Sequence, residues 1–106
     1  MTKTIKWYNI LAMNELYGLV KTPSKIEYEI KENVKLRRKE AKLSQRGLSE
    51  KSGVSLGSIK RFETTGQISL EALIKIGIVL QYEDDFSQLF AKKIYRSIEE
   101  IIDEQN

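Results

Sequence analysis

The polar side chains between Gln45 and Arg61 form the most distinctive cluster of possible binding groups in this chain. The amide of Gln45 and the hydroxyl of Ser55 can exchange hydrogen bonds, and the guanidinium of Arg61 presents N–H donors in a fixed plane. Groups of this kind bind phosphates and the edges of bases without breaking covalent bonds. The full set of candidates is Gln45, Arg46, Ser55, Leu56, Gly57, Ser58, Lys60 and Arg61.

Two short helices joined by a tight turn are predicted to carry these residues. Ser44 is a good N-cap for a helix over Gln45–Ser52, and Gly53 can supply the left-handed residue that ends it. Ser55 can then cap a second helix over residues 56–63. The apolar residues that would join the two helices are Leu48, Val54, Ile59 and Phe62. This pattern is a helix-turn-helix, and the outward face of its second helix suits a DNA major groove.

The motif resembles the Cro/CI-like (XRE-type) helix-turn-helix family between about residues 34 and 80. The matching runs are Leu43-Ser44-Gln45, Leu48-Ser49-Glu50, Gly53-Val54-Ser55 and Ile59-Lys60-Arg61-Phe62-Glu63. Three residues depart from the family pattern. Ser49 stands where alanine is usual, Gly47 weakens the first helix, and Gly57 costs the second roughly 1 kcal/mol relative to alanine. Gly57 could instead let the backbone approach DNA closely.

The resemblance implies roles for the candidate residues. Gln45 and Ser55 match positions that contact the DNA backbone, and Leu56, Gly57 and Arg61 match positions from which base edges are read. Which groups Arg46, Ser58 and Lys60 reach depends on how the helix docks. The family also implies an ion pair between Arg38 and Glu63, with a structural role.

Arg61 is the strongest candidate for sequence recognition. Its guanidinium can bond guanine O6 and N7 together, a contact worth about 1–3 kcal/mol of discrimination. The alternative is an ordinary exposed surface arginine. Leu56 could touch a thymine methyl group, but a half-buried leucine is an equally good interpretation.

Charge is distributed unevenly along the chain. Residues 31–61 hold ten Lys and Arg against three Asp and Glu, a net +7, and the residues from 62 onward hold four against nine, a net −5. A basic patch of this kind attracts phosphates through counterion release. The positive half coincides with the helix-turn-helix and therefore supports nucleic-acid binding over a merely solvated surface.

Composition argues against an enzyme. Histidine and cysteine are both absent from the 106 residues, and there is no glycine-rich phosphate loop. Without cysteine neither a disulfide nor a thiolate metal site can form. The run Glu83-Asp84-Asp85 fits the start of a helix better than a cation site, because consecutive helical residues point in different directions. We expect no cofactor or metal, no membrane segment, and a cytoplasmic, nucleoid-associated protein.

The predicted fold class is all-α, with three segments. Residues 1–22 form a helical extension with an apolar stripe, residues 23–90 a five-helix lambda-repressor-like domain, and residues 91–106 an extension with a terminal helix. Predicted features of the domain are a Ser24–Glu27 capping box for its first helix, a loop at 64–67, a Ser69-capped helix over 70–80, and a short helix containing Phe86, Leu89 and Phe90. Ser97 and Glu100 form a second capping box, and residues 93–96 could add a short β segment.

The run from Leu48 to Glu71 further resembles the HipB-like antitoxins, which act with HipA-type kinase toxins. That resemblance implies a homodimer that represses its own operon at a palindromic operator and binds the toxin. The alternative is a protein-interaction module that neutralises or scaffolds a partner with little stand-alone DNA recognition. The apolar stripe of residues 1–22 could serve dimerisation or fold back on its own domain.

Overall fold

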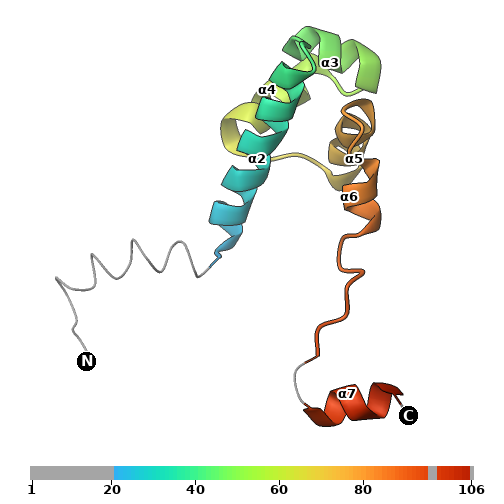
Figure 1. Ribbon diagram of the computed structural model, residues 1–106. Helices are drawn as coiled ribbons and strands as arrows, with labels where there is room; N and C mark the ends of the chain where they lie inside the picture. Colours follow the sequence, from blue (N-terminus) through green and yellow to red (C-terminus); the bar gives the residue numbers. More distant parts are fainter. Residues whose placement is uncertain (1–20, 96–97, 106) are drawn as a thin grey trace, which may run out of the picture.

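The computed structural model describes residues 21–95 and 98–105, and the regular elements in these ranges are all helices (Figure 1). They are α2 (Pro23–Glu40), α3 (Gln45–Ser52), α4 (Leu56–Thr65), α5 (Leu70–Val79), α6 (Glu83–Ser87) and α7 (Ile98–Gln105). The predicted all-α, five-helix domain is confirmed as α2–α6. The helix predicted within residues 1–22 lies outside the described residues, apart from Lys21 and Thr22.

The start of α2 corrects one prediction. The N-cap is Thr22, whose Oγ1 accepts a hydrogen bond of 3.1 Å from the backbone N–H of Lys25. The predicted capping box of Ser24 and Glu27 is therefore wrong. Proline at the first helical position has a φ suited to the helix and lacks only an N–H that would have no intrahelical partner. Pro23 thus favours a helix that begins with it, and the hydroxyl just before it becomes the cap.

The helix-turn-helix forms with the predicted caps. The backbone N–H of Gly47 donates to Ser44 Oγ at 2.9 Å, and that of Ser58 donates to Ser55 Oγ at 3.1 Å. Between the helices Gly53 has a φ of 79°, in the left-handed region. This conformation strains any residue with a Cβ, which explains why glycine ends α3.

Helix α4 extends two residues beyond the predicted end. Thr64 and Thr65 were predicted to start a loop, but both belong to the last turn. Their hydroxyls donate to the carbonyls of Lys60 and Arg61 at 2.9 and 2.8 Å. The helix ends only at Gly66, whose φ of 83° gives a left-handed cap.

The buried core lies between α3, α4 and α5. Its buried apolar side chains are Leu48, Val54, Ile59, Phe62 and Ile76. The first four are the residues predicted to join the helix-turn-helix, and Ile76 adds α5 to them. The framework of the motif is thus held by apolar burial on the inner faces of α3 and α4.

Helices α5 and α6 complete the bundle. Ser69 caps α5 as predicted, with the N–H of Ala72 donating to its Oγ at 3.1 Å. The predicted last residue, Leu80, is the C-cap. Helix α6 ends at Ser87, so the prediction that Leu89 and Phe90 lie within it is wrong. Both residues lie in the turn that follows the helix, and Phe90 has a φ of 61°.

The segment after the bundle is irregular as far as Tyr95. The short β segment considered for residues 93–96 does not form over residues 93–95, and residue 96 lies outside the described residues. Helix α7 is present where it was predicted, while its predicted cap, Ser97, is not described. Figure 1 shows α7 apart from the bundle. Its side chains Ile101 and Ile102 are exposed. Within the described residues, no helix has the length and apolar character needed to cross a membrane.

Candidate nucleic-acid interface

The eight candidate residues lie at the start of α3 and along the outer side of α4. Arg46, Ser55, Gly57, Ser58, Lys60 and Arg61 are exposed, whereas Gln45 and Leu56 are half-buried. Gly57 and Ser58 lie four and three residues before Arg61, a spacing that places all three on one helical face. The opposite face of α4 carries the buried Ile59 and Phe62. The helix is therefore anchored on one side and open to solvent on the other.

A pair of hydroxyls marks the N-terminus of α4. Ser55 Oγ and Ser58 Oγ lie 2.8 Å apart and share one hydrogen bond, while Ser55 Oγ also accepts the N–H of Ser58. Two hydroxyls bring two hydrogens, and their mutual bond uses one. One hydroxyl hydrogen is therefore left for an outside acceptor, at a helix end where the peptide dipoles also favour an anion.

Gln45 is held in place by a buried ion pair. Its Nε2 donates to Glu63 Oε1 at 2.9 Å. Arg38 donates to both oxygens of the same carboxylate, from Nε to Oε2 at 2.6 Å and from Nη2 to Oε1 at 2.9 Å. An amide NH₂ carries two hydrogens, so one remains for a further acceptor such as a phosphate. The network fixes the first residue of α3 without using all of its donors.

The Arg38–Glu63 pair predicted from the family resemblance is present. It joins α2 to α4. Arg38 Nη1 also donates to the carbonyl of Leu43 at 2.8 Å, and Leu43 directly precedes the Ser44 cap of α3. Burial alone raises the pKa of Glu63, but hydrogen bonds from Arg38 and Gln45 and the charge of Arg38 outweigh it, so this pKa is lowered. Glu63 therefore stays ionised and holds three helices together.

The bond between Gln45 and Glu63 was not predicted. Both residues belong to the recognised motif, but they are 18 positions apart, and their contact depends on how α3 crosses α4. The only sequence signal was the implied ion pair of Arg38 with Glu63, because a carboxylate buried in such a pair needs further donors.

Several basic residues of α2–α4 are available for an anionic partner. The ion pairs between described residues involve Lys31, Arg37 and Arg38 in this region. They involve none of the other seven cations of residues 31–61, which are Lys35, Lys39, Lys42, Arg46, Lys51, Lys60 and Arg61. The surplus of positive charge read from the sequence is thus not neutralised internally around the helix-turn-helix.

The described residues offer no group of three or more side chains placed to hold a metal ion. The first turn of α6 holds Glu83, Asp84 and Asp85. Negative side chains at this end of a helix interact favourably with the helix dipole.

Comparison with known families identifies the domain. A family model described as helix-turn-helix matches residues 34–86, half of the chain, and the match includes both helices of the motif with their caps Ser44 and Ser55. The chain belongs to the XRE-type helix-turn-helix family, a class of DNA-binding transcription regulators. Comparison with curated proteins and with solved structures gives no significant match.

Proposed function

We propose that this protein is a dimeric, sequence-specific repressor whose α4 enters the major groove of a palindromic operator. The observation that carries the proposal is the two-sided character of α4. Ile59 and Phe62 fix its inner face in the core, while Gly57, Ser58 and Arg61 form an exposed outer face. A recognition helix needs this combination of rigid support and open polar surface.

Arg61 is assigned to base recognition, and Gln45 and Ser55 to the DNA backbone. The exposed guanidinium of Arg61 is free to make a paired contact with guanine. The second amide hydrogen of Gln45 and the remaining hydroxyl hydrogen of the Ser55–Ser58 pair suit phosphate oxygens. Arg46 and Lys60 flank this set as further phosphate contacts, and the half-buried Leu56 presents a small apolar surface to a thymine methyl group.

Gly57 supports a close approach of the α4 backbone to DNA. A Cβ built at Gly57 meets nothing within 4 Å, so packing within the protein does not require glycine there. Glycine nevertheless weakens a helix interior by roughly 1 kcal/mol relative to alanine. A close external partner on this side of α4 accounts for a residue that the bundle itself does not need.

Two copies of the chain are needed for operator specificity. One helix-turn-helix reads only a few base pairs, whereas two copies about 34 Å apart reach successive major grooves. We assign residues 23–90 to the DNA-binding domain and residues 91–106 to self-association. Phe90 is 94% exposed, and Ile94, Ile101 and Ile102 are apolar side chains that are exposed as well.

The antitoxin role, with a HipA-type kinase toxin as partner, is the finer part of the proposal. Its support is the resemblance of residues 48–71 to HipB-like antitoxins and the apolar surface outside the DNA-facing side. Co-expression with the neighbouring reading frame tests it directly. Stable co-purification with a kinase-like neighbour supports the antitoxin role, and separation of the two during purification contradicts it.

DNA recognition is tested by fluorescence anisotropy on duplexes from the region upstream of the gene, over a series of salt concentrations. Arg61→Ala should lose about 1–3 kcal/mol on the preferred duplex, or about 5- to 150-fold in affinity, and less on unrelated DNA. Lys75→Ala, at an exposed position of α5, is the matched control and should bind like the wild type. Equal effects of the two substitutions would favour the alternative, a protein-interaction module with little stand-alone DNA recognition.

A further inference from the structure

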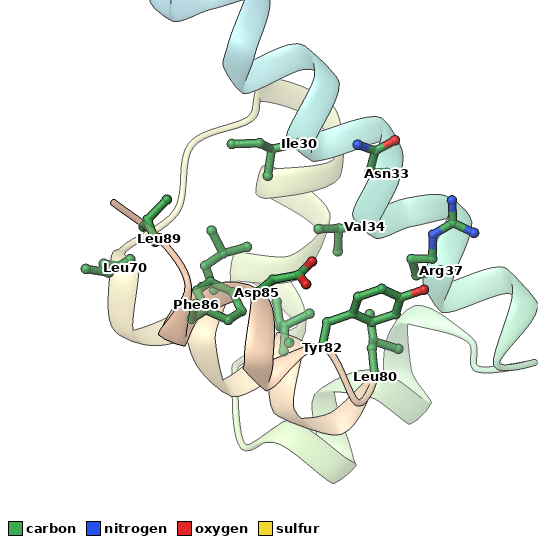
Figure 2. Close-up of a pocket in the computed structure, with 13 residues that line it drawn as sticks. Ile30, Asn33, Val34, Arg37, Leu70, Leu80, Tyr82, Asp85, Phe86 and Leu89 are labelled. Carbon is green, nitrogen blue, oxygen red and sulfur yellow. The ribbon is translucent and has the colours of Figure 1, made fainter. Parts of the chain in front are cut away.

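An apolar groove lies between α2 and the α5–α6 pair, away from the outer face of α4. Its cavity volume is about 510 Å³. Figure 2 shows Ile30 and Val34 on one wall and Leu70, Phe86 and Leu89 on the other. The polar residues among its lining are few, namely Asn33, Arg37, Tyr82 and Asp85.

The apolar residues of the groove are incompletely covered. Ile30 is 38% exposed, Leu70 62% and Leu89 56%. Ile76 of the buried core also lines the groove, so the groove borders the core directly. A contiguous apolar surface of this kind on a small domain generally marks a place where another segment binds.

We propose that residues 1–20 of the same chain occupy this groove as an amphipathic helix antiparallel to α2. The sequence of this segment predicts a helix with one broad apolar stripe. The stripe consists of Trp7, Ile10, Leu11, Met13, Tyr17 and Val20. The inference does not depend on DNA binding, because the groove and the outer face of α4 are separate surfaces.

The point of attachment favours this occupant. The described chain begins at Lys21, directly before the Thr22 cap of α2, and α2 itself forms one wall of the groove. Twenty helical residues span about 30 Å, and the fifteen residues of α2 from Pro23 to Arg37 span about 22 Å. The segment is therefore long enough to run the length of the groove after one reversal of direction at residues 21–22.

The register that follows from such a reversal brings apolar residues together. A residue a given number of positions before Lys21 then lies opposite the residue the same number after Thr22. Met13 falls beside Ile30, and Trp7 falls at the level of Leu36, next to Arg37 at the far end of the groove. Tyr82 also lies at this end, near Arg37 (Figure 2).

Charge at the far end is complementary as well. The segment brings Lys3 and Lys6 to this end, and α6 begins there with Glu83, Asp84 and Asp85. Asp85 lines the groove. Arg37, the one cation among the described residues that line the groove, is paired with Glu40 at 2.6 Å. Opposite charges therefore meet where the start of the segment arrives.

Trp7 provides the test, because it is the only tryptophan in the chain. In the full-length protein its emission should be blue-shifted and poorly quenched by acrylamide. Leu70→Glu places a charge in the groove at the first residue of α5, where a carboxylate suits the helix dipole. It should shift Trp7 emission to longer wavelength and raise quenching several-fold. Leu89→Glu, beyond α6, should have the same effect.

Ile78→Glu is the matched control. Ile78 lies on α5 and is 54% exposed, close to the 62% of Leu70, but it does not line the groove. It should leave Trp7 emission and quenching unchanged, with helix content verified for every variant by circular dichroism. A solvent-exposed Trp7 in the wild type overturns the proposal, and so does a Trp7 that responds equally to Leu70→Glu and Ile78→Glu.

Energy transfer separates the same chain from a second copy as the source of the segment. Because the chain has no cysteine, Ser87→Cys on exposed α6 accepts a single acceptor dye. The labelled chain is unfolded and refolded with a tenfold excess of unlabelled Trp7→Phe chain. Transfer from Trp7 should persist after mixing. Loss of transfer would mean that the segment binds the groove of a partner copy, which contradicts the proposal.

Discussion

Replacing Arg38 by methionine should destabilise the domain far more than the same replacement of its neighbour Arg37. Both arginines lie on α2, and each is paired with a glutamate. The Arg38–Glu63 pair has side-chain exposures of 9% and 4%, whereas the Arg37–Glu40 pair has 33% and 57%. The two variants change charge and side-chain chemistry identically, so burial of the pair is the main difference between them.

The expected magnitude follows from the hydrogen bonds that are lost. Arg38→Met removes two bonds to Glu63 and one to the carbonyl of Leu43, and leaves the buried carboxylate with only Gln45 as donor. Removing one partner of a buried pair costs about 3–5 kcal/mol, because the other charge stays desolvated. Arg37→Met should cost less than about 1 kcal/mol, as exposed pairs contribute little.

Urea denaturation followed by circular dichroism measures both losses. For a small domain, a slope of about 1 kcal/mol per molar urea turns a loss of 3 kcal/mol into a midpoint shift of about 3 M. The double variant Arg38→Met/Glu63→Leu should regain part of the stability, because it removes the unpaired charge. The reasoning is refuted if Arg38→Met costs no more than Arg37→Met, or if the double variant is less stable than Arg38→Met alone.

Three further predictions concern stability. Gly57→Ala should raise the free energy of unfolding by about 1 kcal/mol, and the midpoint by about 4–8 °C, because its Cβ meets open space on α4; an unchanged or lower midpoint in thermal denaturation contradicts this. Gly77→Ala should instead cost about 1–3 kcal/mol, since the added Cβ would lie 2.2 Å from the ring of Phe86; a fully stable variant would show that α6 does not pack as described. The pKa of Glu63 is lower in the folded protein than its unfolded value of about 4.5, so ionisation of Glu63 stabilises the fold. This stabilisation is fully present above pH 4.5 and is lost as the pH falls toward the folded pKa. Thermal midpoints should therefore fall more steeply below pH 4.5 in the wild type than in Glu63→Gln, and parallel curves would argue against this role of the carboxylate.

The sequence predicted the parts of the fold that depend on local signals. Ser44, Ser55 and Ser69 cap the helices that they were expected to cap, because a hydroxyl at that position satisfies a backbone N–H within three residues. Thr22 was missed in favour of Ser24, although the proline between them was the stronger signal. The last turn of α4 was missed because Thr64 and Thr65 are weak helix formers whose hydroxyls find carbonyl partners within the helix.

Features that depend on how the helices pack against one another could not be predicted from the sequence. The hydrogen bond from Gln45 to Glu63 requires the crossing of α3 and α4. The apolar groove depends on the separation of α2 from α5 and α6, and periodicity shows only that each helix has an apolar face. The candidate DNA-facing residues were predicted from motif position, and the structure adds their exposure and the network that orients Gln45.

Sequence recognition by α4 can be measured by selecting bound sequences from random duplex DNA, in parallel with the wild type and Arg61→Ala at near-physiological salt. The wild type should enrich a two-fold symmetric site. Arg61→Ala should lose or alter the preference at one base position in each half-site while retaining the rest. Failure of the folded wild-type protein to enrich any sequence would contradict the assignment of α4 as a sequence-reading helix.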